Sequence, residues 1–187
     1  MTMTETRQRI YFHFSNLFEY PQPGLAEAAR RCADLLTADY PEAAGRVRTF
    51  LDFVESTALG RLEEIYTGTF DVSPTCTIYA GYQLFGESYK RGEFLVRLKE
   101  KYREHGFAED KELADHLAVL LRFLAGLDEE NILAQELIED CLVPSLRKMN
   151  GSFECDSQNP YAYLLGAATA VLEQVLAAKA ACKEAMS

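Results

Sequence analysis

Three polar residues that could do chemistry, Glu112, Asp115 and His116, lie within five positions of one another. Glu112 and His116 are four residues apart, so a helix would place two metal ligands on one face. A di-iron bundle needs paired Glu-x-x-His motifs on two helices, and neither His13 nor His105 has such a glutamate partner. The cysteines also lack the spacing of zinc ligands. We therefore expect no bound metal and no other cofactor.

Acid–base catalysis is the second chemistry that these residues suggest. Asp115 and His116 are adjacent, but neighbours on a helix diverge by about 100°, so they would not form a direct dyad. Gly81 and Gly86 are isolated and offer no glycine-rich phosphate loop. The sequence also has no Gly-x-Ser-x-Gly nucleophile turn. An enzyme is therefore the least favoured function class.

The stretch from Glu112 to Leu124 is predicted to be the helix that positions these residues. One face carries leucines at helical spacing: Leu113, Leu117, Leu120, Leu121 and Leu124. A second stripe beside it is mixed in character: Glu112, His116, Val119 and Phe123. Asp115 points nearly opposite the leucines, so we expect its carboxylate to lie away from the core. The helix either lines a groove or is a central bundle helix touched on two sides; its residues alone favour the second.

An aromatic segment and another helix precede this stretch. Residues 71–77 contain Pro74 and are predicted to form a turn or loop. Residues 78–85 are too apolar to lie fully in water, because of Tyr79, Tyr82, Leu84 and Phe85. A helix is then expected over 88–105. Tyrosines with one polar end suit either a core or a half-exposed groove for a peptide helix, and for most of them we expect the core.

Several short motifs occur in a characteristic order along the chain. They are Leu17-Phe18-Glu19-Tyr20-Pro21, Gly68-Thr69-Phe70-Asp71, Thr77-Ile78-Tyr79, Leu84-Phe85-Gly86, Arg91-Gly92, Leu95, Leu98, Tyr102, Glu112-Leu113-Ala114-Asp115-His116-Leu117 and Asn159-Pro160-Tyr161. Together they resemble the NarJ and TorD/DmsD family of molybdoenzyme assembly chaperones, with the nitrate-reductase branch favoured. The resemblance covers almost the whole chain. One departure is Ala114, where the family usually has proline.

The resemblance implies a cytoplasmic chaperone for the catalytic subunit of a molybdenum-containing oxidoreductase. Such a chaperone binds the subunit's N-terminal leader, twin-arginine or remnant, and holds the subunit for insertion of the molybdenum cofactor before export or membrane docking. Acidic side chains, including Asp115, would attract the leader's arginines. An aromatic and leucine-lined groove would take its apolar part. The matched peptide-binding residues are Glu112, Asp115 and His116, with Tyr79, Leu84, Phe85, Arg91 and Gly92 adjoining them.

Two other function classes stay open. One is a general helical adaptor with an acidic surface and no specificity for leaders, which a pull-down of the bound subunit would separate from a chaperone. The other is a metal- or nucleotide-dependent enzyme, which metal analysis and a nucleotide-binding assay would reveal. The identity of the client oxidoreductase does not follow from the sequence.

The elements around these motifs predict an all-α fold, a single domain over residues 1–187 built as a bundle of roughly seven to nine helices. Helices are expected over 5–19, 25–37, 41–57, 59–70, 88–105, 112–124, 129–149 and 160–183. Pro144 is expected to kink or split its helix. The loops 71–77 and 150–158 are natural hinges for exchanging an element between two copies, which would give a homodimer.

The composition is that of a globular protein, with 48% hydrophobic and 26% charged residues. Nineteen Lys and Arg against 29 Asp and Glu give a net charge of −10, which repels nucleic acid and anionic membranes and favours cationic partners. Simple solubility is the commoner reason for such an excess. We expect neither nucleic acid nor a membrane among the partners.

The cysteines and the N-terminal residues fit a cytoplasmic protein. Five widely spaced cysteines, without a CxxC pair, fit reduced thiols better than a disulfide framework. Residues 1–9 are polar with no apolar stretch behind their charges, so no export signal is expected. The longest weakly polar run, residues 164–172, is far too short to span a bilayer.

Overall fold

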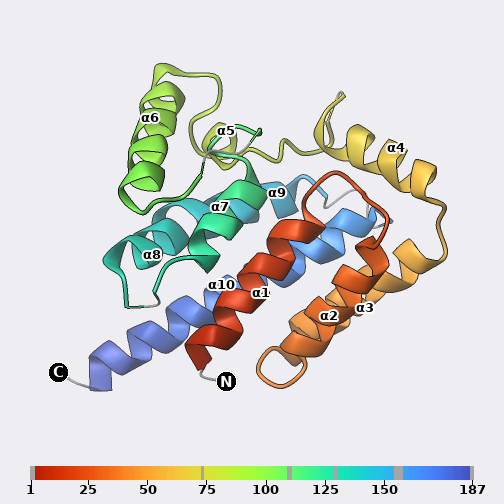
Figure 1. The fold of residues 1–187 in the computed structure, drawn as a ribbon, viewed down its shortest axis with the longest axis horizontal. Helices are drawn as coiled ribbons and strands as arrows, with labels where there is room; N and C mark the ends of the chain where they lie inside the picture. Colours follow the sequence, from red (N-terminus) through yellow and green to blue (C-terminus); the bar gives the residue numbers. More distant parts are fainter. Residues whose placement is uncertain (1–2, 73, 109–110, 129, 154–157, 186–187) are drawn as a thin grey trace.

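The computed structural model describes residues 3–72, 74–108, 111–128, 130–153 and 158–185, with side chains to Cys182, and these ranges are helical with short connections (Figure 1). The helices are α1 (Met3–Leu17), α2 (Leu25–Leu36), α3 (Pro41–Glu55), α4 (Leu59–Phe70), α5 (Ala80–Phe85), α6 (Tyr89–Glu104), α7 (Leu117–Ala125), α8 (Ile132–Glu136), the π-helical segment η1 (Leu137–Leu142), α9 (Val143–Gly151) and α10 (Pro160–Ala185). The run from Ile132 to Gly151 is continuous, so the described residues form nine helices. The predicted all-α class is confirmed.

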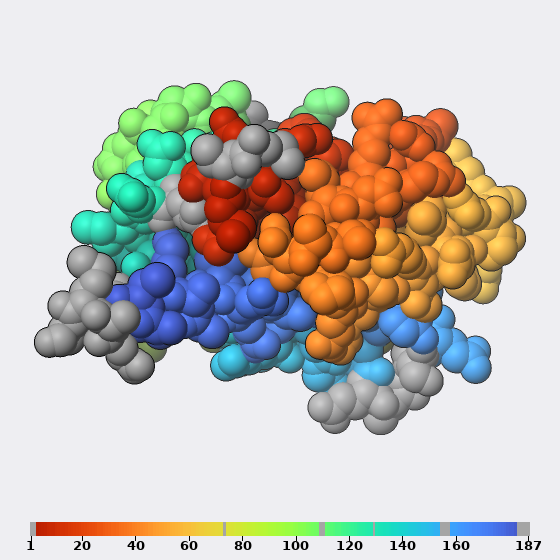
Figure 2. All heavy atoms as spheres, turned by 90° about the horizontal axis from the view of Figure 1, so that it is seen from below, coloured from red at the N-terminus to blue at the C-terminus, as the bar shows by residue number. Residues whose placement is uncertain are grey.

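The core lies where α1, α3, α7 and α10 meet. α1 packs against α2 and α7, and α3 packs against α2 and α10. Figure 2 shows α10, in blue, passing beside the orange α2–α3 pair and below α1 in red. The core-facing residues of α10 are 0–1% exposed: Tyr161, Leu164, Leu165, Ala167, Ala168, Val171, Leu172 and Val175. One apolar face of each helix therefore contributes to a common interior.

The segment Pro160–Cys182 of α10 is long and apolar enough to cross a membrane by length and composition. This apolar stretch is longer than the run of nine residues expected from the sequence. One face of its first four turns is packed inside the bundle.

Pro144 changes the type of its helix instead of breaking it. The π turn η1 ends at Leu142, and the Val143 amide donates to Ile138, five residues back. Proline has no backbone N–H group, so one helical hydrogen bond is missing at Pro144. The wider π turn before it lets the helix continue without that bond. The helix begins at Ile132, where the Asn131 side chain caps it by accepting from Leu133 N at 2.9 Å. The expected start at Glu129 lies outside the described residues.

α6 stands at the edge of the molecule (Figure 1). Leu98 and Tyr102 are its buried residues. The Tyr102 ring lies 4.5 Å from that of Phe123 on α7, and the Tyr102 hydroxyl donates to Ala114 O at 2.7 Å. The C-terminal half of α6 is therefore anchored to the core, while its first turn contains no buried residue.

The helix predicted over 112–124 begins five residues later, at Leu117. Residues 112–116 form an irregular segment before the helix, and Leu113 is 47% exposed. Within α7 the leucines and also Val119 and Phe123 are at most 2% exposed. The groove-lining interpretation of this helix was therefore wrong. α7 is a central bundle helix touched on two sides, as its residues alone indicated.

Candidate functional site

The site is built where residues 78–80 and 115–117 run antiparallel. The Ala80 amide donates to Asp115 O at 2.8 Å, and the Leu117 amide donates to Ile78 O at 3.2 Å. These two bonds form an isolated bridge between Tyr79 and His116. The bridge holds His116 in an extended conformation, and the His116 side chain caps α7 by accepting from Ala118 N at 3.2 Å. This tertiary pairing explains the late start of α7.

Asp115 is fully buried, which corrects the expectation that its carboxylate lies away from the core. It forms an ion pair with Arg91 from the first turn of α6. Arg91 Nε donates to Oδ2 at 2.9 Å, and Nη2 donates to Oδ1 at 3.3 Å. The Arg91 side chain is 19% exposed, so the pair closes a buried charge at the protein surface. Two parallel bonds of this kind match the guanidinium fork to a carboxylate.

Two tyrosine rings complete the surroundings of Arg91. Its guanidinium carbon lies 5.4 Å from the Tyr79 ring centre and 5.7 Å from that of Tyr82, within the range of cation–π attraction. We call Asp115, Tyr79 and Tyr82 the arginine cradle.

Gly81 belongs to this site, although the sequence showed it only as an isolated glycine. A Cβ at this position would lie 2.6 Å from Asp115 Oδ2 and 2.9 Å from Phe94. A side chain at position 81 would therefore displace the carboxylate from the cradle. No motif marks this glycine, since the close approach arises from tertiary packing.

An acidic surface adjoins the cradle and is formed by Glu19, Asp71 and Glu112. The Tyr79 hydroxyl donates to Glu112 Oε2 at 3.2 Å, and burial, reinforced by Glu112, raises the pKa of Tyr79 to about 12. Burial and the charge of Glu112 raise the pKa of Asp71, while His116 opposes this. Burial raises the pKa of Tyr66, and the charges of Asp71, Glu112 and Glu19 add to this shift, so the three carboxylates lie in the neighbourhood of its ring. Glu19 is ion-paired with Arg122, so Asp71 and Glu112 supply the excess negative charge here.

The remaining predicted site residues differ in exposure. His116 is 4% exposed and lies edge-on to Tyr79, with 5.4 Å between ring centres. Leu84 is half-buried against the core, and Phe85 is 38% exposed beside Phe94. Gly92 is exposed and has open space where a side chain would be. Arg91, Tyr79, Asp115, Glu112 and His116 are therefore brought together, while Leu84, Phe85 and Gly92 lie at the margin.

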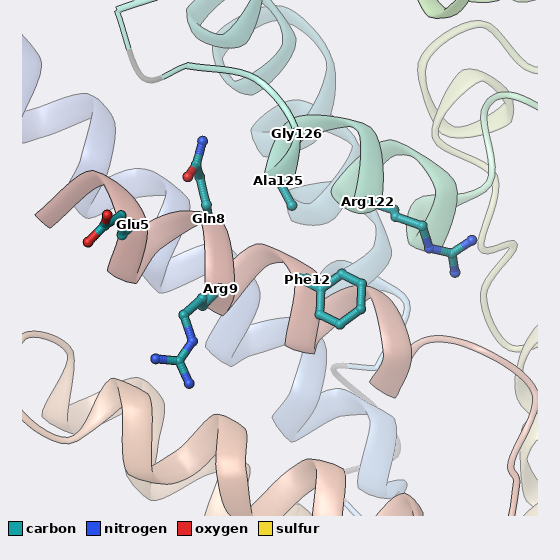
Figure 3. Close-up of a pocket in the computed structure, with 7 residues that line it drawn as sticks. All are labelled: Glu5, Gln8, Arg9, Phe12, Arg122, Ala125 and Gly126. Atoms are coloured by element: carbon teal, nitrogen blue, oxygen red, sulfur yellow. The ribbon is translucent and has the colours of Figure 1, made fainter. Parts of the chain in front are cut away.

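Two hollows lie along α1, outside the predicted residues. The first, about 530 Å³, lies between α1 and α7 (Figure 3) and is lined by Glu5, Gln8, Arg9, Phe12, Arg122, Ala125 and Gly126. The second, about 610 Å³, is lined by Asn16, Glu19, Tyr20, Gln22, Pro23, Gly24, Leu25, Ala28, Lys111 and Arg122. Glu19 belongs to both the second hollow and the acidic surface, so the two adjoin. The sequence pattern does not indicate these hollows, because residues from separate segments of the chain line them.

Comparisons with known proteins address the family. The sequence profile described as "Nitrate reductase delta subunit" matches residues 34–148, which include every predicted site residue. The chain belongs to this family. The probable nitrate reductase molybdenum cofactor assembly chaperone NarJ of Bacillus subtilis (strain 168) is 32% identical over 115 residues, which cover 61% of this chain and 60% of that relative. The match thus spans less than two thirds of the length of that relative.

A solved structure supports the fold. The crystal structure of a candidate redox enzyme maturation protein from Archaeoglobus fulgidus superposes with a TM-score of 0.62, over 92% of this chain and 95% of that chain. Its sequence identity is 23%, so the likeness concerns the fold alone.

The potential metal ligands of the chain are its His, Cys, Asp and Glu side chains. In the part of the chain that the structure describes, no group of three or more His, Cys, Asp or Glu side chains could hold a metal ion. Cys32, Cys76 and Cys141 are buried free thiols, and Cys182 is exposed. Cys155 lies outside the described residues.

Proposed function

We propose that this protein is a cytoplasmic assembly chaperone for the catalytic subunit of a molybdenum-containing oxidoreductase, and that it binds that subunit's basic N-terminal leader. Family membership and the similarity to a chaperone of nitrate reductase support this function. In this proposal the bound subunit is held until the molybdenum cofactor has been inserted, before export or membrane docking.

The observation that carries the proposal is the acidic surface beside the arginine cradle. Glu112 is exposed, and Asp71 has a carboxylate whose neighbour repels it. A leader arginine placed between them would relieve this repulsion and form charge-assisted hydrogen bonds. Asp115 is already neutralised by Arg91, so the first contact falls to Glu112 and Asp71.

The apolar part of the leader would lie in the adjoining hollow beside Tyr20. This tyrosine is 44% exposed and packs edge-on against Tyr66, with 5.5 Å between ring centres. Aromatic side chains with one polar end suit the apolar face of a peptide helix. The leucines of α7 cannot take this role because they are buried.

The proposal is tested by calorimetric titration of the chain with a synthetic peptide that carries paired arginines before an apolar helical segment. The expected result is saturable binding that Glu112→Gln weakens by about 1–2 kcal/mol, since the lost charge pair is partly desolvated. Glu139→Gln, an exposed acid on η1, is the matched control and should bind normally.

A general adaptor would give a different result. A second peptide, with both arginines replaced by glutamine, should bind much more weakly to a chaperone that recognises basic leaders. Equal affinity for both peptides, or an unchanged affinity in Glu112→Gln, would contradict the proposal.

A further inference from the structure

The cradle is a complete binding site for a guanidinium group. Asp115 supplies a fully buried carboxylate, and Tyr79 and Tyr82 supply two ring faces. Gly81 provides the space in which the carboxylate sits. The planar fork and the affinity for aromatic faces distinguish arginine from lysine at such a site. The ligand that this chemistry selects is therefore an arginine side chain.

The cradle can be reached from outside. Arg91 is 19% exposed, so its guanidinium covers the buried carboxylate without being enclosed. Glu112, bonded to the Tyr79 hydroxyl, stands beside the opening. A second arginine attracted by the acidic surface would thus arrive next to Arg91.

Arg91 is poorly placed for the stability of its own helix. It lies in the first turn of α6 beside Lys90, and that turn has no acidic residue. Cations at the positive end of the helix dipole are unfavourable, and Ser88 makes no side-chain cap bond there. Arg91 is therefore held in place by the cradle and not by favourable interactions within its own helix.

The first turn of α6 also has room to move. Tyr89 is 84% exposed, and the buried residues of α6, Leu98 and Tyr102, lie in its second half. Phe94 packs against Phe85, which is itself 38% exposed. The start of α6 can thus shift while its end remains anchored.

We propose that the cradle is an exchangeable arginine site, which Arg91 occupies in the free chain and from which an arginine of the bound leader displaces it. This inference rests on the proposed function. The exchange replaces one guanidinium by another, so both bonds to Asp115 are conserved and no buried charge is left unpaired. Arg91 acts as an internal competitor. The apparent affinity for the leader equals the intrinsic affinity multiplied by the fraction of molecules in which the cradle is free.

The first test measures the affinity of the paired-arginine leader for wild type, Arg91→Ala and Arg91→Lys by titration. Arg91→Ala should bind the leader about tenfold more tightly. This is the effect of raising the fraction of molecules with a free cradle from about one tenth to one. Arg91→Lys keeps a cation over Asp115 and so protects the fold, but it lacks the fork and should give a smaller gain. Arg97→Ala, an exposed arginine on the same helix, is the control and should match wild type. A paired-lysine leader should show little gain.

The second test needs no leader. In Arg91→Ala the cradle is vacated, so millimolar acetyl-arginine amide should raise the melting temperature above that seen with acetyl-lysine amide. Wild type and the Arg91→Ala/Asp115→Asn double variant should show no such difference.

Equal or weaker leader binding by both Arg91 variants would overturn the exchange and make Arg91 a structural latch. The exchange would also be overturned if acetyl-arginine amide raised the melting temperature of Arg91→Ala no more than acetyl-lysine amide does. Failure of the proposed function is a separate result: wild type would then bind no leader, while the arginine-amide titration would still report on the cradle.

Discussion

Asp115 is a buried carboxylate whose charge is balanced by Arg91, and this decides what its removal would do. An unpaired charge in the interior costs more than the pair itself contributes. Asp115→Asn leaves Arg91 without its partner, although that side chain can still reach water. We expect the free energy of unfolding to fall by about 2–4 kcal/mol.

Denaturant unfolding checks this expectation, with Glu112→Gln as the control. Glu112 is exposed, so its substitution should change stability by less than about 0.5 kcal/mol. Equal stability of Asp115→Asn and wild type would mean that the ion pair contributes nothing to the fold.

Asp71 gives the site a pH dependence with two opposite signs. Its pKa in the folded state is raised above the usual value, so the folded chain binds this proton more tightly than the unfolded chain does. As pH falls through the raised pKa, the unfavourable charge is lost and this contribution to stability improves. Protonation of Asp71 also removes the negative charge that attracts the leader's arginine. The affinity for the leader therefore falls over the same pH interval.

Asp71→Asn should remove both effects. Its melting temperature should equal or slightly exceed that of wild type at neutral pH, while the affinity for the leader should fall by about 1 kcal/mol or less. Asp52→Asn, an exposed acid on α3, is the matched control. An Asp71→Asn variant that loses stability at neutral pH would show that this carboxylate has a favourable partner in the fold.

α7 shows at the scale of an element how one stripe can divide between two environments. Leu113 and Leu117 share a helical stripe in the sequence, yet Leu113 is 47% exposed and Leu117 is fully buried. Leu117→Ala should destabilise the fold by roughly 2–5 kcal/mol as a core truncation. Leu113→Ala should cost less than about 0.5 kcal/mol. Similar losses for both would mean that the helix begins near Glu112 after all.

The helices themselves were largely predictable, because periodicity and breakers act locally. α4 has the predicted limits, and α2 ends one residue earlier than expected. The start of α7 was not predictable, since the bridge between Tyr79 and His116 joins segments 37 residues apart in sequence. The Arg91–Asp115 pair was missed for the same reason. Both residues are site candidates in the sequence, but the motif around Arg91 and the motif around Asp115 do not show that the two side chains meet.

At the scale of the whole molecule, a net charge of −10 should make binding of a basic leader sensitive to salt. Charges near a surface are screened within about 8 Å at physiological ionic strength. Raising the salt concentration should weaken binding mainly through slower association, which stopped-flow fluorescence measures. A leader without arginines serves as the control. Association rates independent of salt would count against docking on an acidic surface.

The exchange of elements between two copies stays a prediction. Its hinges, 71–77 and 150–158, include Ser73 and residues 154–157, which lie outside the described residues. Light scattering of the purified chain would distinguish a monomer from a homodimer.

The central claim is that the leader binds at the surface where residues 78–82 meet residues 112–118. Amide hydrogen exchange of the full chain, with and without the paired-arginine leader, tests it most directly. The account predicts slower exchange in both segments on binding, with faster exchange in the first turn of α6 as Arg91 leaves the cradle. Slower exchange confined to the hollow around Phe12 and Arg122, with residues 78–82 and 112–118 unchanged, would contradict it.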